Sequence, residues 1–237
     1  MMKITQEELD RKIEWAANYG GILDLSNFGI TELPKEIQYL TKVKKLILDN
    51  NLLKNIPPEI GGMSGLERLW IRNNLIDSLP LELASIPNLI ELMVDSNHLR
   101  SIPESVLNLQ NIIVLHLNDN NIRNVQEELF ELTSLRILRL GKNSIRELSK
   151  NVKKLMNLRY LGVEQNLLTR LPIQIDDLDD LVDIDRFVHV IFFGNPLIPI
   201  PPEYFGMNEE DDFSDFAWIE YLRLIEKFEI QRVVGRS

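Results

Sequence analysis

The side chains best suited to acid–base chemistry near neutral pH are the three histidines, His98, His116 and His189. The middle one has acidic and amide neighbours in Asp95, Asn118 and Asp119. The chain has no cysteine nucleophile, and it contains neither a G-x-S-x-G nor an H-E-x-x-H pattern. A lone histidine on a surface is more often a binding contact than a base. We therefore predict no enzymatic activity, no catalytic residue and no cofactor, with an enzyme as the remote alternative.

Cation binding is the second kind of chemistry to consider, because six aspartates crowd residues 176–185. A calcium loop needs alternating ligands, a glycine at its sharp turn and a distal glutamate. The segment has none of that order. We predict a solvated helix or loop there and no metal site, with calcium binding as the alternative.

The net charge of −10 is concentrated in the C-terminal third of the chain. Residues 176–185 carry six carboxylates, and residues 203–215 carry six more. Nucleic-acid binding requires a basic surface, so nucleic acid is not expected as a partner.

The elements that must position any site are set by a repeat of 23 residues. Leucine or a similar residue recurs at the positions of Leu46 and Leu48, an asparagine follows at the position of Asn51, and the series continues through Leu168. Self-similarity at such a period indicates stacked units rather than one compact core.

Each unit combines two periodicities. The alternating L-x-L segment predicts a strand whose leucines point inward, and successive strands should pair in parallel about 4.8 Å apart. Ile56, Ile60 and Met63 then follow helical spacing, with Pro57 suited to a first helical turn. Gln126 and Ser149 replace that proline in two units, where a helix or turn is still expected.

The full pattern, L-x-x-L-x-L-x-x-N-x-L-x-x-L-P-x-x-I, resembles the leucine-rich repeat family in its typical 23-residue intracellular form, over about residues 22–204. The segment 13–34 also resembles bacterial members of the family, including the repeat modules of Roco proteins, although no P-loop motif is present. The resemblance implies an α/β fold, a right-handed solenoid with a concave parallel sheet of about eight strands. By analogy with Roco modules and Ras-suppressor-like proteins, it also implies small-GTPase signalling.

Three regions follow from this reading. Residues 1–21 form an N-terminal helical cap that begins at Thr5, residues 22–205 hold eight repeats with a six-residue acidic insertion near 179–186, and residues 206–237 form an acidic connection and a C-terminal helical cap. The alternative for the last helix is a detachable segment that binds a partner.

An inward asparagine carries both donors and acceptors, so it can satisfy the backbone where each strand turns toward the convex side. We assign to this structural ladder the residues Asn51, Asn74, Asn97, Asn120, Asn143, Asn166 and Asn195.

The outward positions of the strands are the ones that are free to serve function. A tryptophan, a methionine and an isoleucine follow one another in one column and are flanked by charge, which is the composition of a protein-binding hot spot. The predicted partner-binding residues are Lys45, Ile47, Asp49, Arg68, Trp70, Arg72, Glu91, Met93, Asp95, His116, Arg139 and Tyr160. The alternative is that these side chains pair across strands and only stabilise the sheet.

We therefore predict a non-catalytic module that binds a protein on its concave face, in intracellular signalling or scaffolding. A structural or host-interaction surface protein is the alternative. The first ten residues have no apolar signal core and no apolar run reaches membrane-spanning length. A cytoplasmic location is thus expected, or secretion if a signal peptide was removed.

Overall fold

The computed structural model describes residues 4–169, 189–192 and 194–196 of the 237-residue chain. The predicted acidic insertion near 179–186 and the predicted C-terminal cap at 206–237 lie outside these residues.

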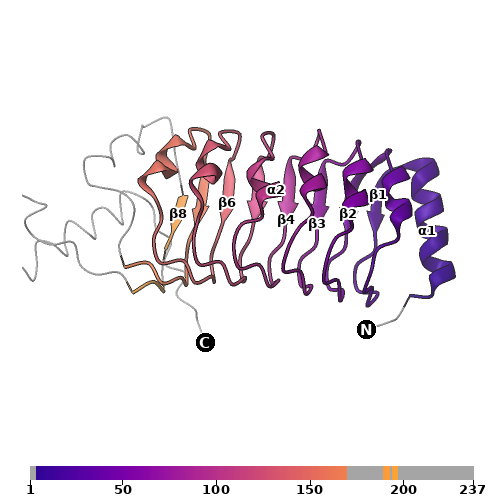
Figure 1. The fold of residues 1–237 in the computed structure, drawn as a ribbon, viewed down its shortest axis with the longest axis horizontal. Helices are drawn as coiled ribbons and strands as arrows, with labels where there is room; N and C mark the ends of the chain where they lie inside the picture. The colour runs from indigo at the N-terminus through magenta and orange to yellow at the C-terminus, as the bar shows by residue number, and fades with distance from the viewer. Residues whose placement is uncertain (1–3, 170–188, 193, 197–237) are drawn as a thin grey trace, which may run out of the picture.

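One open parallel sheet runs the length of the molecule, with its strands in sequence order (Figure 1). Leu46 is paired with Leu69, and Leu69 with Leu92, and the register advances by one 23-residue repeat per strand from the second strand to the seventh, whereas Leu161 pairs with Val190, 29 residues later. The predicted leucine-rich repeat solenoid is therefore confirmed. Its strands are β1 (Gly21–Asp24), β2 (Val43–Ile47), β3 (Arg68–Trp70), β4 (Glu91–Met93), β5 (Val114–His116), β6 (Ile137–Arg139), β7 (Tyr160–Gly162) and β8 (His189–Ile191).

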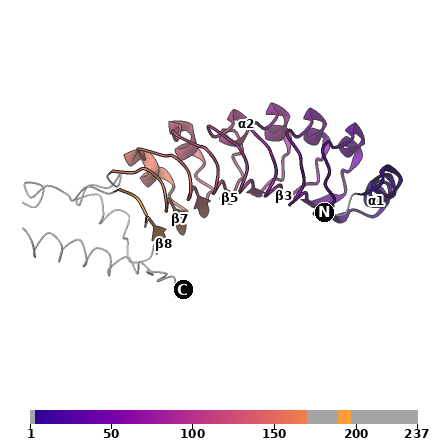
Figure 2. The same ribbon diagram turned by 90° about the horizontal axis from the view of Figure 1, so that it is seen from below.

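Short helices line the opposite, convex side, and the molecule curves around the sheet (Figure 2). They are η1 (Lys35–Tyr39), η2 (Pro58–Gly62), η3 (Leu81–Ser85), α2 (Glu104–Leu107), η4 (Glu127–Glu131) and η5 (Lys150–Lys154). All but α2 are 3₁₀ helices. They are shorter than the helical stripe predicted from Ile56 to Met63, because the chain must return to the next strand within 23 residues.

Pro57 does not lie in the first helical turn, as its type suggested, but caps η2 from outside with extended backbone angles (φ −70°, ψ 150°). Gln126 and Ser149 take the same position with ψ of 146° each, so the helices predicted to follow them form without proline. The Ser149 hydroxyl accepts from the Asn151 N–H at 3.1 Å, and the Gln126 amide donates to the Ile102 carbonyl at 2.8 Å.

Helix α1 (Gln6–Tyr19) covers the first repeat (Figure 1). The Thr5 hydroxyl accepts from the Glu8 N–H at 3.2 Å, and Gly20 ends the helix at φ 69°. That conformation favours glycine, and a Cβ there would also collide with the Lys42 carbonyl oxygen.

The core is a continuous stack of the inward apolar residues. Leu46, Leu69, Leu92, Leu115 and Leu138 are fully buried. Because every repeat contributes the same set, burial of apolar surface stabilises each repeat mainly against its two neighbours. Within the described part of the chain, no helix has both the length and the apolar character needed to cross a membrane.

Candidate functional site

The side-chain amides of the inward asparagines form hydrogen bonds to backbone groups. In the fourth repeat, the Asn97 Oδ1 accepts from the Ile76 N–H at 2.9 Å, and its Nδ2 donates to the Ile71 carbonyl at 2.9 Å and the Val94 carbonyl at 3.2 Å. The same arrangement recurs at Asn51, Asn74, Asn120, Asn143, Asn166 and Asn195. Both N–H donors of each amide are used by backbone carbonyls, and each Oδ1 accepts a backbone N–H, so these side chains serve the fold.

The outward residues between the strand leucines form one column across the sheet. Ile47 pairs with Trp70, Trp70 with Met93, Met93 with His116, and His116 with Arg139. All five are half-buried and lie on the concave side, outside the leucine core. The register therefore brings together the predicted residues of repeats two to six.

The indole of Trp70 is held by side chains from three consecutive repeats. The Lys45 ammonium lies 3.0 Å from the centroid of the ring, and the Arg72 guanidinium carbon lies 4.9 Å from it. The indole N–H donates to the Glu91 carboxylate at 2.5 Å. The sequence predicts an apolar centre flanked by charges, whereas in the structure the cations lie directly over the aromatic ring.

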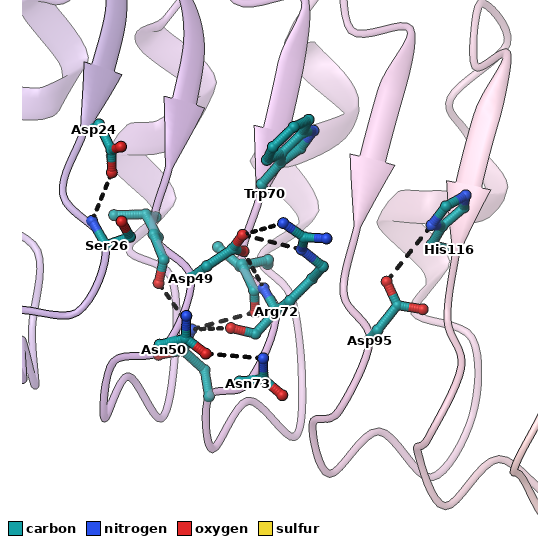
Figure 3. Close-up of polar contacts among 12 residues, drawn as sticks. Asp24, Ser26, Asp49, Asn50, Trp70, Arg72, Asn73, Asp95 and His116 are labelled. Atoms are coloured by element: carbon teal, nitrogen blue, oxygen red, sulfur yellow. Dashed lines mark hydrogen bonds and ion pairs between the residues drawn. The ribbon is translucent and has the colours of Figure 1, made fainter.

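Asp49 fixes one of these cations (Figure 3). One carboxylate oxygen accepts from Arg72 Nε at 3.0 Å and from a terminal nitrogen of the same guanidinium, and the other accepts from the Arg72 backbone N–H at 2.7 Å. The side-chain hydrogen bond to Asp49 raises the pKa of the Arg72 guanidinium, and burial opposes this effect. The negative charges of Asp49, Asp95 and Glu91 raise the pKa further. Asp49 itself is only 5% exposed, so it positions Arg72 rather than offering a contact of its own.

Arg68 on β3 and Glu91 on β4 are also joined. Arg68 Nε lies 3.5 Å from the Glu91 carboxylate, so Glu91 links Arg68 to Trp70. We call Lys45, Asp49, Arg68, Trp70, Arg72 and Glu91 the braced cluster.

Carboxylate and amide side chains extend the parallel ladder beyond the strand ends, a feature that the sequence analysis missed. Asp49, Asp95 and Asn118 each accept the backbone N–H of the residue one repeat later, at 2.7, 3.1 and 2.7 Å. The signal in the sequence was the Asp or Asn two positions after the outward column.

The C-terminal part of the concave face is organised differently. His116 Nδ1 lies 3.6 Å from Asp95 (Figure 3), which is too long for a hydrogen bond. The Arg139 guanidinium lies 4.8 Å from the Tyr160 ring centroid, and within the described residues Arg139 Nε and Glu164 Oε2 are buried without a hydrogen-bond partner. Burial raises the pKa of Tyr160, the positive charge of Arg139 lowers it, and the negative charge of Glu164 raises it further. We call Arg139, Tyr160 and Glu164 the open cluster.

No group of three or more potential metal ligands is found among the described residues. The Asp-rich segment 176–185 lies outside them.

Comparison with known families agrees with this geometry. Residues 41–99, 87–145 and 110–168 match a family model described as leucine rich repeat. The chain belongs to the leucine-rich repeat family. This family is generally a non-catalytic protein-interaction fold.

Two solved structures illustrate the similarity to other leucine-rich repeat proteins. A leucine-rich repeat protein of Leptospira interrogans has a TM-score of 0.69 and 27% identity, over 86% of this chain and 55% of that one. An internalin of Listeria monocytogenes has a TM-score of 0.59 and 21% identity, over 73% of this chain and 48% of that one, and shows the fold alone. This leucine-rich repeat chain thus spans about half the length of these relatives. No curated protein matched its sequence.

Proposed function

We propose that this leucine-rich repeat protein is a non-catalytic recognition module that binds a protein partner on its concave face, centred on the braced cluster. We further propose a cytoplasmic role in signalling or scaffolding, which follows from the 23-residue repeat type and its analogy with modules that act beside small GTPases.

The proposal rests on the indole of Trp70, which is partly exposed and already held in one position. Its indole is half-buried on the concave surface and is fixed by Lys45, Arg72 and Glu91. Binding costs rotamer entropy at each side chain that becomes ordered, about 0.5–1.5 kcal/mol for a long one. A tryptophan and an arginine that are already ordered lose less of it, and these two residue types dominate binding hot spots.

The size of the face is adequate for a protein. Eight parallel strands extend over roughly 35 Å, and a standard interface needs about 800 Å² per partner. Cross-strand contacts of this kind also stabilise the sheet, so the two roles of the cluster must be separated by experiment.

The test is to capture a partner from lysate of the source cells with the whole chain and then to compare variants. Trp70→Ala should weaken binding about 30-fold or more, which is about 2 kcal/mol. Its melting temperature should stay within a few degrees of the wild type, because Trp70 lies outside the leucine core.

Trp15→Ala is the matched control, since it removes another indole that is 54% exposed and lies on α1 rather than on the sheet. The control should bind normally. Unfolding of Trp70→Ala would make Trp70 a structural residue, and unchanged binding would remove the braced cluster from the interface.

A further inference from the structure

Three arginines recur on one flank of the solenoid, where the chain leaves the concave face. Arg100, Arg123 and Arg146 each lie three residues after a ladder asparagine and therefore occupy the same position in consecutive 23-residue repeats. All three are exposed. Among the described residues, none of them forms an ion pair or a hydrogen bond to a carboxylate. An uncompensated basic row is notable in a chain with a net charge of −10.

A pocket of about 490 Å³ lies between two of these arginines. It is lined by Arg123, Asn124, Ser144, Arg146 and Leu167. Among the described residues, no carboxylate lines it. A pocket of about 550 Å³ on the opposite flank is lined by Arg136 but also by Glu67.

The lining supplies donors in excess of what one carboxylate can use. Each guanidinium has five N–H donors in a planar fork, and the Ser144 hydroxyl and the Asn124 amide add further donors. In the described structure neither of these two side chains forms a hydrogen bond. A carboxylate has two acceptor oxygens, whereas a phosphate monoester has three and carries close to two negative charges at neutral pH.

The fifth lining residue points to the kind of molecule that carries the phosphate. Leu167 is 44% exposed and gives the pocket an apolar wall. Such a wall suits the carbon atoms of a peptide next to a phosphorylated side chain, and the pocket is far larger than a phosphate group alone.

We propose that this pocket binds a phosphate monoester carried by a peptide segment of a partner protein, with Arg123 and Arg146 as the charge-assisted donors and Ser144 and Asn124 as the additional ones. The site is separate from the braced cluster, and it makes recognition by this flank dependent on phosphorylation of the partner.

The experiment measures binding of the full chain to a short fluorescent glycine-rich peptide with one phosphoserine, at physiological ionic strength. The unphosphorylated peptide and a peptide with glutamate in place of phosphoserine are measured in parallel. The phosphopeptide should bind at least about 10-fold more tightly than either, a difference of about 1.4 kcal/mol.

Three variants locate the site. The double variant Arg123→Gln/Arg146→Gln should lose this preference without a change in melting temperature, because both side chains are exposed. Arg123→Lys/Arg146→Lys keeps the charge but loses the forks, and should lose most of the preference. Arg136→Gln, in the pocket that contains a glutamate, should behave as wild type.

Four results would overturn the proposal. They are equal binding of the phosphorylated and glutamate peptides, retention of the preference in the Gln double variant, and binding to phosphoinositide vesicles but to no phosphopeptide. The fourth is binding that appears only after Asp176, Asp177, Asp179 and Asp180 are changed to Asn, which would assign the pocket to an acidic segment of this same chain.

Discussion

The two ends of the concave face share a backbone but use their outward positions in different ways. In the braced cluster, each charged or aromatic side chain is held by a neighbour from an adjacent repeat, as Arg72 is by Asp49 and Trp70 by Glu91. In the open cluster, Arg139 and Glu164 keep buried atoms without partners in the described structure. The leucines and ladder asparagines are the same in both clusters. The repeat therefore fixes the backbone, and the outward residues decide how well the side chains of the concave face are held by their neighbours.

The tight turn that follows each strand also differs between earlier and later repeats. The residue before each ladder asparagine adopts a left-handed backbone conformation throughout, with φ of 57° at Asn50 and 53° at Asn73 but also 52° at Lys142 and Gln165. Asparagine tolerates this conformation, whereas lysine and glutamine are strained in it. Local sequence preferences therefore agree with the fold better at Asn50 and Asn73 than at Lys142 and Gln165, whereas Gly194 takes the same position before Asn195 with φ of 72°.

The largest expected effect is the loss of a ladder asparagine, a residue that both ends of the concave face share. Asn97→Ala would leave the buried Ile76 N–H without its acceptor and would remove one of the two side-chain donors to the Ile71 and Val94 carbonyls, which should cost about 3 kcal/mol of unfolding free energy. Asn143→Ala, in a later repeat, should cost about the same, and denaturant unfolding measures both.

Asn121→Ala is the control, because Asn121 is an exposed asparagine next to a ladder position. It should change the unfolding free energy little. A large difference between Asn97→Ala and Asn143→Ala would mean that the ladder does not support the repeats equally.

Two glycines, one in an early repeat and one in a later repeat, should differ in how well they tolerate a Cβ atom. A Cβ on Gly65 would collide with the Thr41 backbone carbonyl, whereas a Cβ on Gly141 would meet the carboxylate at the flexible end of Glu164. Gly65→Ala should therefore destabilise the chain by about 2–3 kcal/mol, and Gly141→Ala by less than about 1 kcal/mol. Thermal and denaturant unfolding of the two variants check this order, and the reverse order would contradict it.

The smallest effect concerns the strained turn. Lys142→Asn should raise the unfolding free energy by about 0.5–1 kcal/mol, because asparagine accepts φ near 52° at lower cost. Asn50→Lys is the reciprocal change and should lower it by a similar amount. If Lys142→Asn is neutral or destabilising, the strain at the later turns is not real.

The register of the strands and the outward columns could be predicted from the sequence, because residues 23 positions apart occupy equivalent places in successive repeats. The 23-residue spacing gave the register, so the column Ile47, Trp70, Met93 followed directly. Arg123 and Arg146 follow the same period, but they lie outside the strand columns from which the site was predicted.

What the period could not give was the conformation of long side chains. Arg72 lies over the indole of Trp70 with its guanidinium held by Asp49, and Lys45 lies over the same ring. The burial of Asp49 was also hidden, since an outward position is normally exposed. The convex helices were expected to be longer than the 3₁₀ turns that form, because apolar spacing does not distinguish the two kinds of helix.

The most direct test of the account is a comparison of two aromatic substitutions on the same face. The dissociation constant of the captured partner should rise about 30-fold or more for Trp70→Ala, in the braced cluster, and less than about 3-fold for Tyr160→Ala, in the open cluster. Equal effects, or a larger effect of Tyr160→Ala, would contradict the claim that recognition is centred where the concave face is already ordered.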